Sequence, residues 1–281
     1  MSYAINFLYD KSFAFNFLYD GLYLSDFGFI ICEFGGSSGT DIVSAGSKIT
    51  FNTVSQHLGK KYSSTGIKYE ECIQATINIC KDPRLNNDLE ISKDEYNDLM
   101  RWLNRHKFLK FQLLNAENDN YCPCYYEASF NIDKVKVGEV LIGLELSMET
   151  NRPFGYGQLY GVSWNITDTS KPYIFRDISD EIGYIYPDLK ITINTDGEFR
   201  LYNEFEGCSM VIKNCKAGEV ITIDGTNQII NSSLDSHKVY DDFNYDYFRI
   251  GNTLNCRNNK IYCSLPCKLE IKYNPIIKDS P

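Results

Sequence analysis

Residues 138–157 have the sequence GEVLIGLELSMETNRPFGYG, in which two adjoining patterns determine the fold that we predict. Apolar residues occupy every second position from Val140 to Met148, which is typical of a strand with one buried face. Pro153 and two glycines follow directly, as in a loop between folded regions. The stretch therefore predicts a strand that ends a first domain and a boundary near Pro153, after which a second domain begins.

The sequence before this stretch predicts more strands and one helix. Alternating apolar residues indicate three further strands: residues 70–80, 108–114 and 121–132. Ser92 and Glu95 match a capping box, and apolar residues at helical spacing follow them up to a basic end. We therefore predict one helix over residues 93–106. Three of its side chains are expected to pack on the sheet of the same domain: Leu99, Trp102 and Leu103.

The sequence after this stretch contains many short alternating segments and no helix pattern. Turn residues separate these segments at Asp196-Gly197, at Asp224-Gly225 and at Pro266. We predict a hairpin at each of these places, the first with a primed turn. Short strands at this spacing indicate a β-sandwich.

Composition agrees with a folded, β-rich chain. The 281 residues are 43% hydrophobic and 23% charged, which argues against disorder, collagen and coiled coil. The 21 Tyr and 17 Phe favour strands. The predicted fold class is mostly β: an N-terminal β-domain with one α-helix over residues 1–153, followed by a C-terminal β-sandwich over residues 154–281.

The charge balance argues against tight binding of nucleic acid. The chain has 28 Lys and Arg against 37 Asp and Glu, a net charge of −9. The deficit is spread over both halves, and no cluster of basic residues stands out. Since binding to phosphates depends on clustered Lys and Arg, we expect no tight contact with DNA or RNA.

The N-terminal residues and the cysteines predict synthesis in a cytoplasm. Asp10 and Lys11 interrupt the apolar start, which does not match a signal peptide. No stretch reaches the roughly 18 apolar residues of a membrane span, so membrane insertion is not expected. The ten cysteines are expected to be free thiols, because thiols stay reduced in such a compartment.

No residue pattern predicts catalysis. His57, His106 and His237 are scattered, and none has the spacing of an acid–base or metal site. A solvated or helix-end position is the expectation for each of them. We therefore predict no catalytic residues.

The cysteines, glycines and acidic residues likewise predict no metal and no cofactor. Cys122 and Cys124, and the group of Cys256, Cys263 and Cys267, lack the two-residue knuckles of structural zinc sites. Glycines at positions 155, 157 and 161 have the wrong interval for a phosphate loop, and we interpret them as a hinge. Four residues lack the Gly and the distal Glu of a calcium loop and are interpreted as a solvated turn: Asp241, Asp242, Asn244 and Asp246.

Several segments, in order along the chain, resemble the distal tail proteins of phages that infect Gram-positive bacteria, the siphovirus-type tail component family. The early segment is residues 15–30, with Phe15-Asn16-Phe17, Gly21 and Ser25-Asp26-Phe27-Gly28-Phe29-Ile30. The later segments are Gly218-Glu219-Val220-Ile221-Thr222-Ile223-Asp224-Gly225, Asp242-Phe243-Asn244-Tyr245, Arg249-Ile250-Gly251-Asn252 and Cys267 with Tyr273-Asn274-Pro275. The resemblance extends over nearly the whole chain.

This resemblance implies a structural hub protein of a phage tail or of a phage-derived particle. Members of the family form a six-fold ring through the N-terminal domain and carry a galectin-like sandwich on its outside. The ring joins the tail tube to tail-tip or baseplate proteins and lies on the path of the genome. The expected partners are thus five further copies and neighbouring tail proteins, and the expected location is the virion tail.

Two other classes of function are weighed against the hub. The alternative is a carbohydrate-binding or receptor-binding protein that uses the galectin-like sandwich, although a fold alone does not define a function. Trp164 is the one tryptophan of the second domain that could stack on a sugar. An enzyme such as a cell-wall hydrolase is the third class, and no catalytic pattern supports it.

Overall fold

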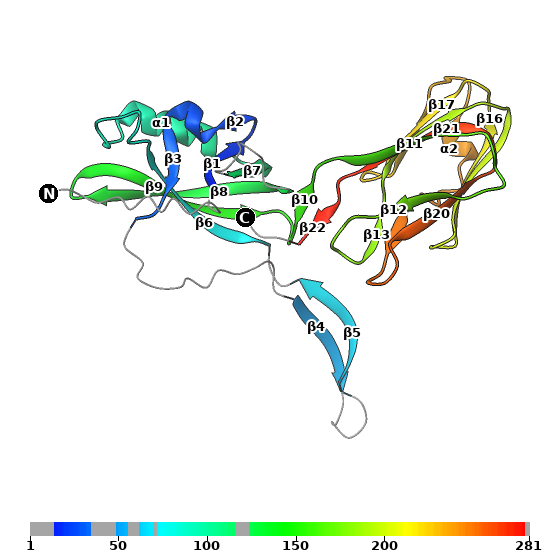
Figure 1. Cartoon of the computed structure of the whole chain (residues 1–281), viewed down its shortest axis with the longest axis horizontal. Helices are drawn as coiled ribbons and strands as arrows, with labels where there is room; N and C mark the ends of the chain where they lie inside the picture. Colours follow the sequence, from blue (N-terminus) through cyan, green and yellow to red (C-terminus); the bar gives the residue numbers. More distant parts are fainter. Residues whose placement is uncertain (1–13, 35–48, 56–61, 70–71, 116–123, 279–281) are drawn as a thin grey trace. The chain divides into compact units, whose positions relative to one another are not determined.

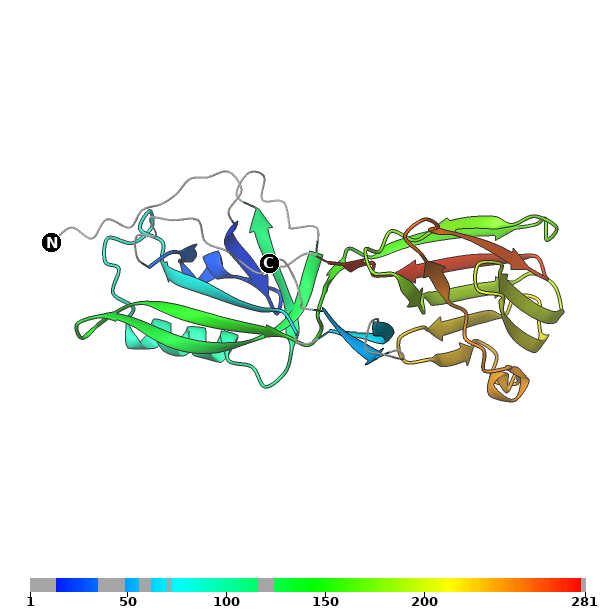
Figure 2. The ribbon, with the colours of Figure 1, turned by 90° about the horizontal axis from the view of Figure 1, so that it is seen from below.

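The computed structural model describes residues 14–34, 49–55, 62–69, 72–115 and 124–278. They form two compact units (Figures 1 and 2). Unit 1 extends to Tyr156 and also takes in the chain end from Ile277, whereas unit 2 comprises Gly157–Ile276. The chain therefore passes between the units twice. The predicted boundary near Pro153 stays a prediction.

Unit 1 is built on one sheet with strand order β2-β1-β7-β8-β9-β6-β3, to which β10 is added beside β8 and β22 beside β10. The elements of this sheet are β1 (Ala14–Tyr19), β2 (Leu22–Tyr23), β3 (Phe29–Cys32), β6 (Gln74–Lys81), β7 (Leu109–Asn115), β8 (Cys124–Val137), β9 (Val140–Thr150), β10 (Gly155–Gly157) and β22 (Ile276–Ile277). A short 3-10 helix, η1 (Leu24–Phe27), joins β2 to β3. β4 (Ile49–Ser55) and β5 (Tyr62–Tyr69) form a separate two-stranded hairpin.

The helix α1 (Lys93–Leu103) lies along one face of this sheet (Figures 1 and 2). The predicted capping box is confirmed: the Glu95 amide donates to Oγ of Ser92 at 3.3 Å, and the Ser92 amide donates to Oε2 of Glu95 at 2.8 Å. The helix ends at Leu103 rather than at residue 106, because Asn104 leaves the helical region with a ψ of 84°. An isolated helix of this length is marginal, so its packing on the sheet stabilises it.

Trp102 is the centre of the contact between α1 and the sheet. Its side chain is 3% exposed and stacks on the rings of Phe27 and Phe17, with centroids 4.4 and 5.6 Å away. Its indole Nε1 donates to the carbonyl of Tyr19 at 2.9 Å. Leu99 and Leu103 are fully buried beside it. The predicted packing of these three helix residues on their own domain is confirmed.

Unit 2 is a β-sandwich, as predicted from the sequence. One sheet has the order β11-β21-β14-β17-β18, and the other has the order β12-β20-β15-β16. The elements of the first sheet are β11 (Tyr160–Ile166), β14 (Asp188–Ile193), β17 (Val220–Asp224), β18 (Ile229–Ser232) and β21 (Cys267–Tyr273). Those of the second sheet are β12 (Tyr173–Arg176), β15 (Gly197–Asn203), β16 (Cys208–Cys215) and β20 (Asn258–Cys263). A small pair, β13 (Gly183–Ile185) with β19 (Ile250–Asn252), and the four-residue helix α2 (Val239–Asp242) complete the unit.

Two of the three predicted hairpins are wrong. β14 pairs with β17 and β21, whereas β15 pairs with β16 and β20, so the chain crosses between the sheets at Asp196-Gly197. It crosses again at Pro266, from β20 to β21. Each sheet turns its apolar face towards the core that the two sheets share. The alternation of apolar and polar residues therefore continues through each crossing as it would through a hairpin. The hairpin at Asp224-Gly225 is confirmed, because β17 pairs with β18.

The two crossings lie side by side. The amide of Asn194 donates to the carbonyl of Pro266 at 3.1 Å, which joins one crossing to the other. The carboxylate of Asp196 accepts from the amide of Ala217 at 2.8 Å, in the turn between β16 and β17. Asp196 therefore stabilises a neighbouring turn instead of closing a primed turn of its own.

Candidate functional site

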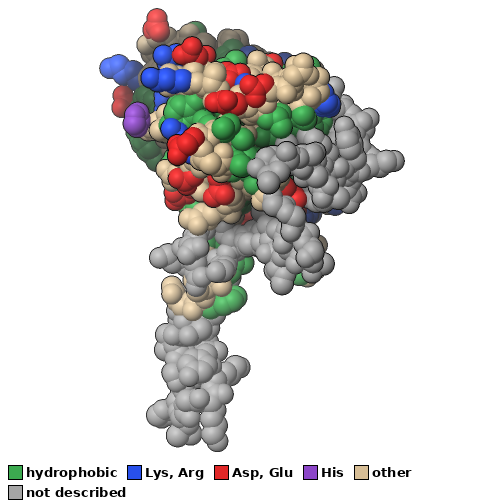
Figure 3. Space-filling view, turned by 90° about the vertical axis from the view of Figure 1, so that its left-hand side faces the viewer, with side chains coloured by type: hydrophobic (Ala, Val, Ile, Leu, Met, Phe, Trp, Pro, Cys, Tyr) green, Lys and Arg blue, Asp and Glu red, His purple; other side chains and the backbone are tan. Residues whose placement is uncertain are grey.

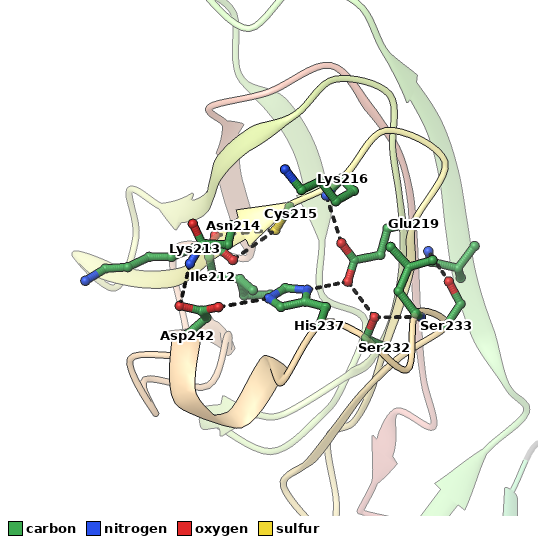
Figure 4. Close-up of polar contacts among 12 residues, drawn as sticks. Ile212, Lys213, Asn214, Cys215, Lys216, Glu219, Ser232, Ser233, His237 and Asp242 are labelled. Carbon is green, nitrogen blue, oxygen red and sulfur yellow. Dashed lines mark hydrogen bonds and ion pairs between the residues drawn. The ribbon is translucent and has the colours of Figure 1, made fainter.

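A buried group of ionisable side chains lies in unit 2 (Figure 4). Glu219 comes from the turn between β16 and β17, His237 from the segment after β18, and Asp242 from the end of α2. The side chains of Glu219 and His237 are 0% and 4% exposed. Nδ1 of His237 lies 2.6 Å from Oε1 of Glu219, and Nε2 lies 3.3 Å from Oδ2 of Asp242 without hydrogen-bond alignment. The imidazole thus sits between two carboxylates.

Both carboxylates have further partners. Glu219 accepts from the amide of Lys216 at 2.9 Å and from the hydroxyl of Ser232 at 2.5 Å. Asp242 accepts from the side-chain amide of Asn214 at 2.8 Å. The group therefore fastens β18 and α2 to the end of β16. A helix of only four residues needs such contacts, because one turn is not stable by itself.

The arrangement does not provide an activated nucleophile. The hydroxyl of Ser232 donates to Glu219, and both ring nitrogens of His237 face carboxylates, so His237 is not placed to take a proton from Ser232. The thiol of Cys215 donates to the carbonyl of Ile212 at 3.4 Å, and burial raises its pKa to about 11. We conclude that the group stabilises the fold.

The charge of Glu219 is maintained despite its burial. Burial by itself raises the pKa of a carboxyl group. The hydrogen bonds from Ser232 and His237 outweigh this effect and hold the pKa of Glu219 below its ordinary value. The buried imidazole and carboxylate therefore form an interaction that acidification weakens.

The three histidines differ in their positions. His57 lies outside the described residues. His106 is exposed, three residues past the end of α1. The expected solvated or helix-end position is wrong for His237, which is buried between two acids that lie far from each other in the sequence. No spacing pattern could have revealed this, since the contacts form only when the sandwich folds.

The metal and hinge candidates also have definite places. In the part of the chain that the structure describes, no three His, Cys, Asp or Glu side chains come together as a metal site. Cys122 lies outside the described residues, and Cys124 is buried beside the Tyr126 hydroxyl at 3.1 Å. Cys256 is exposed, whereas Cys263 and Cys267 are buried.

The three glycines of the predicted hinge lie in strands next to the boundary between the two units, and their action as a hinge stays a prediction. Gly155 and Gly157 belong to β10, and Gly161 belongs to β11. A Cβ atom on Gly155 would lie 2.8 Å from the ring of Tyr126, and one on Gly161 would lie 2.7 Å from the carbonyl of Ile271. These glycines allow close packing of strands.

The solvated-turn interpretation of the four residues is confirmed for Asp241, Asn244 and Asp246, which are exposed, whereas Asp242 is half-buried and ends α2. Asn244 also accepts from the amide of Val211 at 3.0 Å and donates to the carbonyl of Ser209 at 2.8 Å. Asp246 accepts from the thiol of Cys208 at 3.1 Å. These side chains hold the segment after α2 against β16.

The outer face of the four-stranded sheet has an aromatic pair that the sequence analysis missed. The rings of Tyr202 and Tyr262 are half-buried neighbours, with centroids 6.1 Å apart. Glu204 accepts from the hydroxyl of Tyr262 at 3.0 Å and from Nζ of Lys260 at 2.8 Å. Trp164 is half-buried and packs against the sandwich core. Each tyrosine lies between two residues whose side chains point into the core. Alternation along β15 and β20 could therefore have placed both tyrosines on the outer face.

Comparison with known families decides the kind of protein. Residues 13–152 match the family described as phage tail protein N-terminal domain, and residues 154–273 match the family described as phage tail C-terminal domain. The chain belongs to these phage tail proteins. The resemblance proposed from the sequence is confirmed at this level. No curated protein matches the chain.

This tail protein also resembles a solved structure over most of its length. The match is to the Dit protein of SPP1, described as a paradigm of the hub adsorption apparatus in phages that infect Gram-positive bacteria. Sequence identity is 11%, the TM-score is 0.66, and the match covers 93% of this chain and 99% of that one. At this identity the similarity establishes the fold, which confirms the predicted mostly-β class.

Two surface observations complete the description. Among the residues that the structure describes, no helix has the length and apolar character of a membrane span. On the face of unit 1 drawn in Figure 3, Asp and Glu side chains are mixed with Lys and Arg. The described part of that face therefore has no continuous basic stripe.

Proposed function

We propose that this tail protein is a hub of the phage tail, or of a phage-derived particle, located on the virion tail. The supporting observation is that two family matches in order and one structural match span both units, with nearly complete coverage of each chain. This chain matches the fold of the SPP1 Dit protein through both of its units, in the same order along the sequence. It can therefore occupy the corresponding position in its own tail. Fold similarity alone would be a weaker argument.

In this proposal, six copies form a ring through residues 1–153, and residues 154–281 form a galectin-like sandwich on its outside. The ring joins the tail tube to tail-tip or baseplate proteins, and its opening lies on the path of the DNA. The net charge of −9 supports such a conduit, because a channel that bound phosphates tightly would retain the genome. Assembly takes place in the host cytoplasm, and no membrane insertion is part of the role.

The proposed role is structural and not enzymatic. The geometry of the Glu219–His237–Asp242 group supports this, since its histidine is enclosed by carboxylates and its neighbouring Cys215 is a buried thiol of raised pKa. Incubation of the purified protein with peptidoglycan in a zymogram should leave the substrate intact. A cleared band that persists after repeated purification would contradict the structural role.

Co-purification tests the hub directly. The full chain is co-expressed with the tail tube protein and a tail-tip protein of the same phage, with a tag on the full chain only. The proposal predicts that both partners are retained in one complex. Retention of neither partner at physiological salt would overturn it.

A second candidate function, glycan binding, is favoured by the outward pair of Tyr202 and Tyr262. Two neighbouring, tilted aromatic rings beside a carboxylate and an ammonium group offer both an aromatic surface and hydrogen-bond partners for a sugar. A glycan array with the full chain tests this, with Tyr202→Ala as the variant that alters the tyrosine pair and Tyr245→Ala as the control, which removes a tyrosine elsewhere on unit 2. Binding lost only in Tyr202→Ala supports the candidate, and an array without binding rejects it.

A further inference from the structure

Two pairs of cysteine side chains lie near each other in the described part of the chain. Cys32 contacts Cys80 in unit 1, and Cys263 contacts Cys267 in unit 2. All four are free thiols. The pairs differ in access, because Cys32 is half-buried whereas the other three are buried. Only the pair in unit 1 therefore combines an accessible thiol with a second thiol beside it.

The strand register explains this contact. β3 and β6 are antiparallel, with Ile30 opposite Cys80 and Cys32 opposite Asn78. Cys32 follows Ile30 by two residues, so both cysteines lie on the same face of the two strands. β3 is the last strand at its end of the sheet order. The accessible thiol thus lies at a sheet edge, and its partner is held in the adjacent strand.

We propose that Cys32 and Cys80 form a redox-sensitive pair that closes to a disulfide when the folded protein meets a disulfide oxidant. Cys80 accepts the proton of Cys32 while the accessible Cys32 sulfur attacks one sulfur of the oxidant, which breaks the oxidant's S–S bond and releases one of its sulfurs as a thiolate that takes up a proton. The Cys80 sulfur then attacks the Cys32 sulfur of the mixed disulfide and releases the second thiol. The protein loses two hydrogens in all, and the oxidant is reduced to two thiols.

The disulfide would have a structural consequence for unit 1. It would join the edge strand β3 to β6 and close a loop of roughly 50 residues, which includes the β4–β5 hairpin. Closing a loop of that length restricts the unfolded chain strongly, so the melting temperature of unit 1 should rise by roughly 5–10 °C. A tail protein that is assembled in a reducing cytoplasm and leaves with the virion would pass from the open to the closed state. This last step rests on the proposed function, whereas the thiol chemistry does not.

Oxidation of the full native chain tests the pair. The purified protein is incubated with oxidised glutathione, its remaining thiols are alkylated, and its peptides are identified by mass spectrometry. We expect a Cys32–Cys80 disulfide that dithiothreitol reverses, while Cys263 and Cys267 remain alkylated thiols after unfolding. The exposed Cys256 should take up glutathione and shows that the oxidant is active.

Two variants make the result specific. Cys80→Ser should leave Cys32 with a glutathione adduct and no internal disulfide, because the resolving thiol is gone. Cys263→Ser should leave the Cys32–Cys80 disulfide unchanged. The proposal is overturned when Cys32 stays a free thiol although Cys256 has reacted completely, or when Cys32 pairs with a different cysteine. Failure of the tail role would leave this chemical result unaffected, so the two proposals are tested separately.

Discussion

Replacement of Trp102 by alanine is the perturbation that tests the packing of unit 1 most severely. Truncation of a buried aromatic side chain costs about 3–5 kcal/mol, through lost transfer free energy and the cavity that remains. Loss of the indole donor also leaves the buried Tyr19 carbonyl without that hydrogen bond, at about 1 kcal/mol. The expected loss is thus about 4–6 kcal/mol, a large part of the stability of a typical domain.

Differential scanning calorimetry together with tryptophan fluorescence measures this loss. For a unit of this size, the expected loss lowers the melting temperature of unit 1 by roughly 10–20 °C. The chain has 2 Trp, so Trp164 remains in the Trp102→Ala variant and reports on unit 2 alone. The fluorescence transition of unit 2 should therefore keep its midpoint.

Trp102→Phe is the matched control. It keeps most of the stacking against Phe17 and Phe27 but loses the indole N–H, so its cost should be about 1–3 kcal/mol. The packing account is refuted when Trp102→Ala lowers the melting temperature of unit 1 no further than Trp102→Phe does. That result would mean that the stacked rings contribute little to the stability of the sheet and helix.

The remaining predictions concern unit 2, the domains and DNA. Glu219→Gln should destabilise unit 2 by about 1–3 kcal/mol in urea unfolding, because it replaces the buried carboxylate that accepts hydrogen bonds from Lys216 and Ser232 and contacts His237, and an unchanged unfolding midpoint contradicts this. In the folded protein the pKa of Glu219 lies below its ordinary value of 4.5. The ionised carboxylate therefore contributes its full stabilisation above pH 4.5 and loses it as the pH falls towards the folded pKa. In that acidic range the difference in unfolding free energy between the wild type and Glu219→Gln should shrink. By light scattering, residues 1–153 expressed alone should be oligomeric and residues 154–281 monomeric, and the reverse result would overturn the assignment of the ring surface. Duplex DNA at low ionic strength should keep its electrophoretic mobility with micromolar protein, whereas a salt-sensitive shift would contradict the proposed conduit.

Local sequence patterns predicted the elements of this fold well. The capping box of Ser92 and Glu95 is a contact between near neighbours, so it can be recognised before any tertiary structure is known. The alternation in residues 138–149 likewise reports directly on the two faces of β9. A local pattern of this kind predicts its element correctly when it agrees with the burial that the tertiary fold imposes.

Pairing between elements was harder to predict, for a physical reason. Alternation shows which side of a strand is buried, but in a sandwich both sheets bury the same core, so it does not show whether consecutive strands share a sheet. For this reason the pattern at Asp196-Gly197 predicts a hairpin, although the chain crosses between the two sheets there. The burial of His237 was missed because Glu219 and Asp242 approach it only in the folded sandwich.

Electron microscopy of the purified full-length chain tests the central claim most directly. Negatively stained particles are recorded for the chain alone and for the chain co-expressed with the tail tube protein of the same phage, and their rotational symmetry is determined by class averaging. The hub account predicts a six-fold ring with a central opening. Single copies in both preparations, or a ring of another symmetry, would contradict it.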